Sequence, residues 1–224
     1  MWMNLLRLGL LPTGLLLALP SVQALPMGSP GDTMVMVDLG ADERELSANY
    51  AVSSRLAWGA SLGRWEEMQP HGSHQQALVR DFTQLTLTHR VKRWNLPHAQ
   101  ANVWLVGQAG TVRGDGFKGS SRLGGLSLMA DYETTRVYLG GGWRPMRGGS
   151  SLRHDSTWLR AGFSFYEVEY EQVQPWLIVE TKQVRTRWGQ ETTLTPMLRF
   201  IHKRVFFEAG GNRKGGQLNF MLNL

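Results

Sequence analysis

Three consecutive residues, His154, Asp155 and Ser156, are the side chains of this sequence best suited to catalysis. A serine, a histidine and an acid form the active site of many hydrolases, in which the acid orients the histidine and the histidine activates the serine. Ser150 and Ser151 lie close by in the sequence. Adjacency in the sequence is not the geometry of such a site, and a His-Asp pair on a solvated loop is usually polar surface. We therefore expect no catalytic residues and predict that the chain is not an enzyme.

Two further motifs have residue types that bind metals or cofactors. His71 and His74, in HGSH, have a spacing that suits two imidazoles on one metal ion, but no third ligand lies nearby in the sequence. The stretch GDGFKG, 114–119, matches the dinucleotide-binding pattern G-x-G-x-x-G, which needs a helix after it to receive the pyrophosphate. The residues that follow, SSRLGGLSLMADY, have the pattern of a strand. We predict a flexible hairpin loop there, and neither a cofactor nor a metal.

The start of the chain has the features of a signal peptide. Met1 to Arg7 carries one positive charge, Leu8 to Leu19 is rich in leucine, and the small residues before the predicted cleavage point end at Ala24. Pro12 interrupts the apolar run, which is shorter than the ~20 residues of a membrane-spanning helix. We predict a signal peptide over residues 1–24 and one domain over 25–224. The absence of cysteine excludes lipidation at the cleavage point, disulfides and thiol chemistry.

The chain is moderately basic, with 24 Lys and Arg against 18 Asp and Glu. The basic residues are scattered singly through alternating segments, without a basic run interleaved with aromatic residues, so we expect no nucleic-acid partner. For an exported protein the expected partners are lipid headgroups or a small anionic solute.

A period of two residues is the main structural signal. The larger residues Leu56, Trp58, Ala60 and Leu62 share one face of their segment, and Ala57, Gly59, Ser61 and Gly63 share the other. The same alternation recurs over 125–132, 136–144, 205–210 and 217–224. Such repeats predict strands that face lipid on one side, in segments near the ~9–11 residues of a membrane-spanning strand. A soluble β-sandwich would show the same period and stays an alternative.

Twelve strands are expected from this pattern. They span 33–39, 45–52, 56–67, 77–91, 99–112, 121–131, 136–144, 157–168, 175–187, 192–202, 205–211 and 217–224. Connections after even-numbered strands are short, as at 53–55, 132–135 and 203–204, whereas three after odd-numbered strands are longer, at 68–76, 113–121 and 144–156. This asymmetry is typical of an outer-membrane barrel with periplasmic termini. Because two strand pairs have weak patterns, eight or ten strands remain alternatives.

Aromatic residues lie near the ends of the expected strands, where a membrane barrel places its interfacial girdles. They are Tyr50, Trp65, Trp94, Tyr132, Trp143, Tyr170, Trp176 and Trp188. Apolar residues at only every second position of these segments are expected if lipid contacts only one face of each strand.

Three segments carry a resemblance to a known group of proteins: NYAVSSRLAWG (49–59), VKRWNLPHAQANVWLVGQAG (91–110) and PMLRFIHKRVFFEAGGNRKGGQLNFMLNL (196–224). The first resembles a hairpin of Gram-negative outer-membrane β-barrels, and the other two resemble an uncharacterised proteobacterial group of such barrels. The resemblance implies an all-β, closed antiparallel transmembrane β-barrel in the outer membrane, and it supplies no activity. It also implies contact with the barrel-assembly machinery through the C-terminal strand, where Leu224 stands in place of the phenylalanine that many such barrels have.

Function must then come from the lumen and the loops. Ten charged residues are predicted to form a polar network in the lumen: Arg64, Glu66, Arg90, Asp131, Arg136, Arg144, Glu180, Lys182, Arg199 and Glu208. Their arginine excess favours anions, so we expect a small channel or solute-binding barrel. The alternatives are a structural or adhesive barrel whose lumen is closed by internal ion pairs and, third, a lipid-modifying or proteolytic barrel hydrolase.

Overall fold

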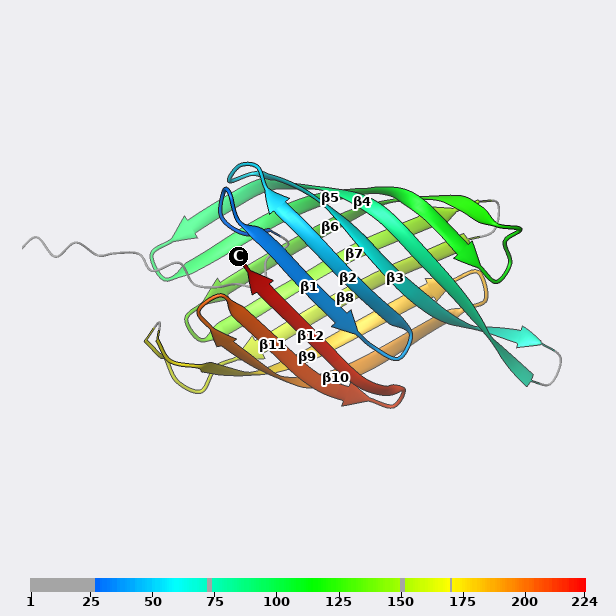
Figure 1. The fold of residues 1–224 in the computed structure, drawn as a ribbon. Helices are drawn as coiled ribbons and strands as arrows, with labels where there is room; N and C mark the ends of the chain where they lie inside the picture. Colours follow the sequence, from blue (N-terminus) through cyan, green and yellow to red (C-terminus); the bar gives the residue numbers. More distant parts are fainter. Residues whose placement is uncertain (1–26, 72–73, 150–151, 170) are drawn as a thin grey trace, which may run out of the picture.

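The computed structural model of the protein describes residues 27–71, 74–149, 152–169 and 171–224, which form a closed barrel of twelve antiparallel strands (Figure 1). The strands are β1 (Thr33–Leu39), β2 (Glu43–Ala51), β3 (Leu56–His71), β4 (His74–Leu96), β5 (Ala99–Gly114), β6 (Ser120–Thr134), β7 (Val137–Gly148), β8 (Leu152–Phe163), β9 (Gln174–Thr186), β10 (Gln190–His202), β11 (Val205–Asn212) and β12 (Gly215–Asn223). The predicted twelve-stranded barrel is therefore confirmed. The predicted signal peptide, residues 1–24, lies outside the described residues. Within the described part of the chain, no helix is long and apolar enough to cross a bilayer.

The barrel closes where its first strand pairs with its last. Thr33 and Leu224 exchange backbone hydrogen bonds of 3.1 and 2.8 Å, and the ladder continues to the pair Leu39 and Leu218. Each strand otherwise pairs with its neighbours in the sequence, so no strand edge is left unpaired. We call the end that holds Leu224 the terminal end, and the opposite end, with the connections after odd-numbered strands, the hairpin end.

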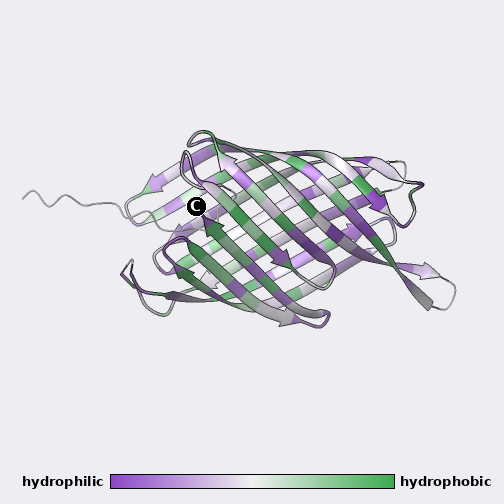
Figure 2. Cartoon of the chain, viewed as in Figure 1, coloured by the Kyte–Doolittle hydropathy of each residue, from purple (hydrophilic) through white to green (hydrophobic). Residues whose placement is uncertain are grey.

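Leucines and other large apolar side chains cover most of the outer face, and most polar side chains in the middle of the strands face inward. Leu85, Leu159 and Leu194 are each more than 60% exposed, whereas Gln84 and Thr195, one residue from two of them, are buried. Figure 2 shows the resulting alternation along the strands. A soluble sandwich buries its apolar face, so this arrangement excludes the sandwich and is that of a barrel in lipid.

The predicted difference in loop length is wrong. β3 extends to His71 and β4 begins at His74, while β7 extends to Gly148 and β8 begins at Leu152, so strand replaces most of the expected loops 68–76 and 144–156. The β3–β4 hairpin projects beyond the other strands (Figure 1). The longest connection, 164–173, lies at the terminal end. The alternation of apolar residues stops where strands leave lipid, but the backbone ladder continues into water because it needs no apolar side chains.

The predicted aromatic girdle is found in part. Tyr50, Trp94 and Tyr132 are exposed on the outer face near the terminal end, and Trp143 is exposed on β7. Trp65 and Trp176 are instead almost completely buried in the lumen, because their positions in the alternation point inward. Trp188 lies in the turn between β9 and β10, and Tyr170 lies outside the described residues.

Three apolar clusters fill much of the lumen. Two lie at the terminal end: cluster A comprises Met34, Tyr138, Trp176, Ile178, Met197, Ile201, Phe206 and Met221, and cluster B comprises Met27, Ala51, Ala57 and Trp104. Cluster C lies towards the hairpin end, on β3–β8, and comprises Trp65, Phe82, Val112, Leu123, Met146 and Leu152. The remaining space opens towards the hairpin end and is lined by side chains of β1, β2 and β4–β12.

Candidate functional site

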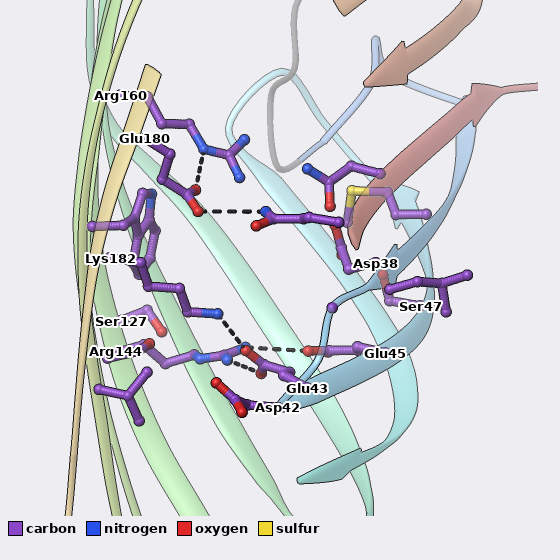
Figure 3. A pocket seen from close by; sticks show the side chains of 18 of the residues that line it. Asp38, Asp42, Glu43, Glu45, Ser47, Ser127, Arg144, Arg160, Glu180 and Lys182 are labelled. Atoms are coloured by element: carbon purple, nitrogen blue, oxygen red, sulfur yellow. Dashed lines mark hydrogen bonds and ion pairs between the residues drawn. The ribbon is translucent and has the colours of Figure 1, made fainter. Parts of the chain in front are cut away.

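A cavity of about 340 Å³ occupies this remaining space (Figure 3). Its rim at the hairpin end includes Asp42, Glu191 and Lys214, and its floor includes Phe206 and Met221 of cluster A. The Lys214 ammonium lies 2.6 Å from Asp42 Oδ2 and also forms an ion pair with Glu191. The cavity has the size of a small-molecule site, which in proteins is about 300 Å³ or more.

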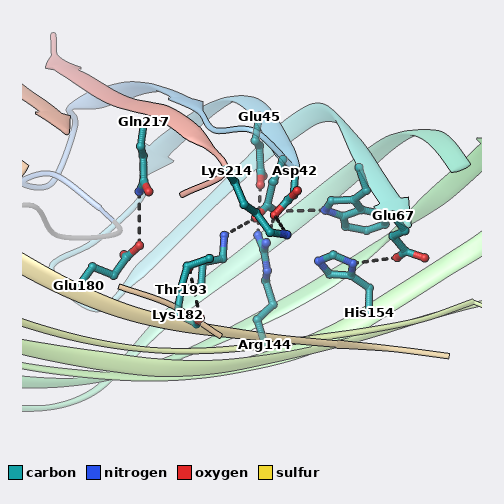
Figure 4. A network of polar contacts seen from close by, with 12 residues as sticks. Asp42, Glu45, Glu67, Arg144, His154, Glu180, Lys182, Thr193, Lys214 and Gln217 are labelled. Carbon is teal, nitrogen blue, oxygen red and sulfur yellow. Dashed lines mark hydrogen bonds and ion pairs between the residues drawn. The ribbon is translucent and has the colours of Figure 1, made fainter. Parts of the chain in front are cut away.

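One wall of the cavity is joined to the opposite wall through Glu43. The Lys182 ammonium on β9 donates to Glu43 Oε2 over 2.7 Å, and Arg144 on β7 pairs with Glu43 and, at 3.1 Å, with Glu45 on β2. Trp65 Nε1 also donates to Glu43 over 3.1 Å. In the circular strand order, β2 lies five strands from both β7 and β9. These ion pairs therefore cross the lumen (Figures 3 and 4).

A second charged network lies deeper, on β8–β12. Arg160 lies 2.5 Å from Glu180 and 3.4 Å from Glu208, and Arg199 Nε donates to Glu208 over 2.8 Å. The Arg199 guanidinium also stacks over Tyr138, 4.5 Å from the ring centroid. Charges this deeply buried require partners, and here each finds one on another strand.

The lining of the cavity carries charges of both signs. Its acids are Asp38, Asp42, Glu43, Glu45, Glu180 and Glu191, and its bases are Arg144, Arg160, Lys182 and Lys214. Asp38 faces Glu45 in the strand register, and no described residue forms a hydrogen bond or ion pair with its carboxylate. Six acids against four bases make the lining slightly acidic, with one carboxylate left without a partner.

His154 lies in the lumen, on β8, and its partner is Glu67 on β3 rather than Asp155. Its Nδ1 is 3.0 Å from Glu67 Oε1, and both side chains are 3% exposed (Figure 4). Arg80 pairs with the other oxygen of Glu67, and the Trp65 ring stacks on the imidazole with centroids 4.6 Å apart. The His154 Nε2 is buried, and no described residue hydrogen-bonds to it.

Asp155, the acid next to His154 in the sequence, has other partners than the imidazole. Asp155 faces outward and pairs with Arg147 and Arg153. Ser156 is buried and lines the cavity with His154. Ser150 and Ser151 lie outside the described residues, as do the side chains of His71 and His74. No group of three or more potential metal ligands occurs in the part of the chain that the structure describes.

Seven of the ten residues predicted for the lumen face inward: Arg90, Asp131, Arg144, Glu180, Lys182, Arg199 and Glu208. Five of them belong to the two networks through the contacts given above: Arg144, Glu180, Lys182, Arg199 and Glu208. Arg90 lies over the Trp104 ring, and Asp131 accepts hydrogen bonds from Asn102 and Trp104 near the terminal end.

Three predicted lumen residues lie elsewhere. Arg64 and Glu66 point outward, since they follow Leu62 at intervals of two and share its face. Arg136 lies in the turn before β7, where it donates to the carbonyls of Ser164 and Phe165.

Several lumen residues were missed by the sequence analysis: Asp38, Glu43, Glu45, Glu67, Arg80, His154 and Arg160. The alternation contains a signal for some of them. Leu46 and Leu159 are exposed on the outer face, so Glu45 and Arg160, one residue away, must face inward. The pairing of Glu67 with His154 depends on the closed barrel and has no sequence signal.

Comparisons with known proteins identify the fold. No protein-family model and no curated protein matches the chain. Among solved structures, LpxR from Salmonella typhimurium matches with 8% identity and a TM-score of 0.50, over 86% of this chain and 99% of LpxR. A KdgM porin in complex with disordered oligogalacturonate matches with 9% identity and a TM-score of 0.49, over 86% and 97% of the two chains.

One of these matches corrects the prediction that the chain is not an enzyme. LpxR is an outer-membrane enzyme, and its barrel is similar in shape to this one. At 8% identity the similarity extends to the fold and not to the activity, but a barrel of this fold occurs in an enzyme, so the prediction that the chain is not an enzyme does not hold. With its closed twelve-stranded ladder and lipid-facing apolar surface, the chain is a porin-like transmembrane β-barrel of the outer-membrane type.

Proposed function

We propose that the protein is a small-solute barrel of the Gram-negative outer membrane, exported by a signal peptide at residues 1–24 and inserted by the barrel-assembly machinery through its C-terminal strand. The hairpin-end cavity is the solute site, and the cross-lumen ion pairs of Glu43, next to Asp42 at the rim, restrict passage through it. The observation that carries the proposal is the position of Glu43, held between Arg144 and Lys182 from the opposite wall, beside a cavity of about 340 Å³.

Charged residues at this position support a closure of the lumen that has a function, rather than side chains that only fill the interior. Clusters A and C fill other parts of the same lumen with apolar side chains. Replacing a buried ion pair by apolar residues is often neutral or stabilising, so stability alone does not require charges here. A charged solute can compete for the ion pairs, whereas it gains nothing from an apolar plug.

The solute is proposed to be small and charged. An anionic group would compete with Glu43 for Arg144 and Lys182, and a cationic group would contact Asp38, whose carboxylate has no partner among the described residues. The ion selectivity of the open state would show which of the two groups dominates.

The test is conductance. After fractionation of the native protein with membranes, the purified barrel would be studied in planar bilayers beside Glu43→Gln and, as a matched control, Glu66→Gln on the outer face. We expect rare openings in the wild type and the control. Glu43→Gln should open more often, by about tenfold for each ~1.4 kcal/mol removed from the closed state. Silence of all three proteins would favour the closed structural barrel, and recovery in the soluble fraction would overturn the membrane location.

A second candidate function is acid-base catalysis by His154 on a small substrate in the cavity. It is favoured by the buried Nε2 without a partner and by Glu67 at Nδ1, the arrangement in which an acid orients a histidine base. Hydrolysis of a small ester such as p-nitrophenyl acetate should fall more than tenfold in His154→Gln. It should be unchanged in His89→Gln, which alters a histidine on the outer face. Equal rates in the wild type and His154→Gln would rule this candidate out.

A further inference from the structure

A partial ring of arginines, called the arginine ring below, follows the outer face of the barrel at the hairpin end from β2 to β9. Its members, all exposed and all on strands, are Arg44, Arg64, Arg113, Arg122, Arg147, Arg153 and Arg185. On the terminal half of the outer face, the corresponding strand positions of the described residues carry one formal charge, Lys92. The ring therefore marks one border of the apolar surface.

The ring has more positive charge than its own acids neutralise. The outward acids beside it are Glu66, Asp81 and Asp155, so three carboxylates serve seven guanidinium groups. No described residue forms an ion pair or hydrogen bond with the Arg122 side chain, and Arg44 lies 3.8 Å from Glu66. This excess favours an external anion.

The strand register places arginines directly opposite one another. Arg44 is the partner of Arg64 across β2 and β3, and Arg147 is the partner of Arg153 across β7 and β8. Like charges at directly opposed positions destabilise a sheet unless an anion lies between them. Asp155 already does this for Arg147 and Arg153, because it contacts both guanidinium groups. Among the residues that the structure describes, no carboxylate contacts both Arg44 and Arg64.

The height of the ring matches the border of a bilayer. On β6, Arg122 and the girdle residue Tyr132 are ten residues apart and both face outward. At a rise of ~3.3 Å per residue and a strand tilt of ~40°, they are separated by about 25 Å along the barrel axis. This is the ~25 Å height of the apolar band of outer-membrane barrels. The arginines consequently lie at the level of lipid headgroups.

A groove in the ring offers both an anion site and an apolar contact. It crosses the outer face of β3–β6 and is lined by Leu62, Arg64, Asp81, Arg113 and Ser120, together with Thr83 and Thr111. Arg64 and Arg113 flank Asp81 in the strand register, while Leu62 lies on the lipid side of Arg64. A headgroup phosphate in the groove would accept hydrogen bonds from guanidinium and hydroxyl groups while its acyl chains contact the apolar belt.

From this combination we propose that the arginine ring binds the phosphate groups of an anionic lipid in the leaflet at the hairpin end, with the groove between Arg64 and Arg113 as its principal site. The inference is independent of the solute proposed for the lumen, because every residue involved is on the outer face. It also assigns the hairpin end to the more anionic leaflet of the membrane.

The experiment is native mass spectrometry of the detergent-solubilised full barrel, titrated with a diphosphorylated glycolipid, lipid A, and with its dephosphorylated form. We expect the wild type to retain the phosphorylated lipid at least tenfold more strongly than the other. The double variant Arg64→Gln/Arg113→Gln should lose most of this difference. The matched control Arg55→Gln/Arg204→Gln removes two exposed positive charges at the terminal end and should bind as the wild type does.

Two further measurements separate the possible outcomes. The heat-dependent mobility of each variant in SDS gels reports folding, so weak binding by a folded ring variant supports the proposal. Inorganic phosphate should compete only at concentrations far above that of the lipid, and competition at similar concentrations would identify a site for free phosphate instead. Equal retention of the phosphorylated lipid by the wild type and the folded ring variant would overturn the proposal.

Discussion

The lumen and the outer face use the same type of ion pair in opposite environments. Inside, Arg199 Nε lies 2.8 Å from Glu208, with side chains 2% and 0% exposed; outside, Arg64 Nε lies 2.7 Å from Asp81, with side chains 48% and 35% exposed. Geometry alone would rank the two pairs as equal. Burial makes their strengths differ, because water screens the outer pair, whereas the buried charges depend on one another. The deep pair of Arg199 and Glu208 is therefore structural, whereas the outer pair of Arg64 and Asp81 is exchangeable.

The largest loss of stability is expected on replacement of Glu208, the acid of the inner pair. Replacement by Gln leaves the buried Arg199 without its carboxylate, while Arg160 keeps only Glu180 and Asn219 loses a charged acceptor. Removing one partner of a buried ion pair commonly destabilises a protein by about 3–5 kcal/mol. Urea unfolding in detergent, followed by tryptophan fluorescence, would measure the loss. A decrease below about 1 kcal/mol would mean that water reaches the network and that the two environments are not so different.

An intermediate effect is expected at His154. Its replacement by Phe keeps a ring against Trp65 but removes the partner of Glu67 Oε1, which leaves a buried carboxylate oxygen without its histidine. A buried group that loses its hydrogen bond costs about 1–3 kcal/mol. The same unfolding measurement applies, with His154→Gln as the control that retains a hydrogen-bonding side chain. A stability of His154→Phe equal to that of the control would show that the contact with Glu67 contributes nothing.

The alternation of the sequence predicts which face a residue takes but not which residue it meets. It is sufficient for the twelve strands, the lipid-facing leucines and the inward position of Arg144, Glu180 and Lys182. The alternation also predicts that Arg64 faces outward, because it lies two residues from Leu62 and shares its face. The inward prediction for Arg64 was therefore wrong although the pattern itself is correct.

The contacts across the lumen could not be predicted in this way. Glu43 and Arg144 are 101 positions apart and meet only because the closed barrel brings β2 and β7 face to face. Which residues meet depends on the shear of the barrel and on how side chains fill its interior, and neither quantity is encoded locally. The strand extensions at the hairpin end were missed for a related reason, since polar strands in water have no apolar alternation to reveal them.

The stabilisation by the ion pairs of Lys214 is expected to depend on pH. These ion pairs lie at the rim of the cavity, where the side chains are neither fully buried nor fully exposed. Lys214, in the turn between β11 and β12, is partly buried, which by itself lowers its pKa, but its hydrogen bonds to Asp42 and Glu191 outweigh burial and raise the pKa above the ordinary 10.5. Because the folded-state pKa is the higher one, the stabilisation is complete below pH 10.5 and is lost as the pH rises through the folded-state value. Lys214→Met should remove this alkaline loss. Identical stability profiles between pH 9 and 12 for the variant and the wild type would contradict it.

The smallest effect on stability is expected for the outer pair of Arg64 and Asp81. Arg64→Gln should leave the unfolding midpoint in urea unchanged within experimental scatter, because the Arg64 side chain is exposed and its interaction with Asp81 is screened by water and salt. Asp81→Asn is the more informative variant, since it removes the acid between Arg64 and Arg113 and so increases the positive charge of the groove. If the ring binds lipid phosphate, Asp81→Asn should retain lipid A more strongly than the wild type while its stability in lipid-free detergent stays unchanged. A clear loss of stability in that detergent would show instead that the outer pair, like the inner one, holds the barrel together.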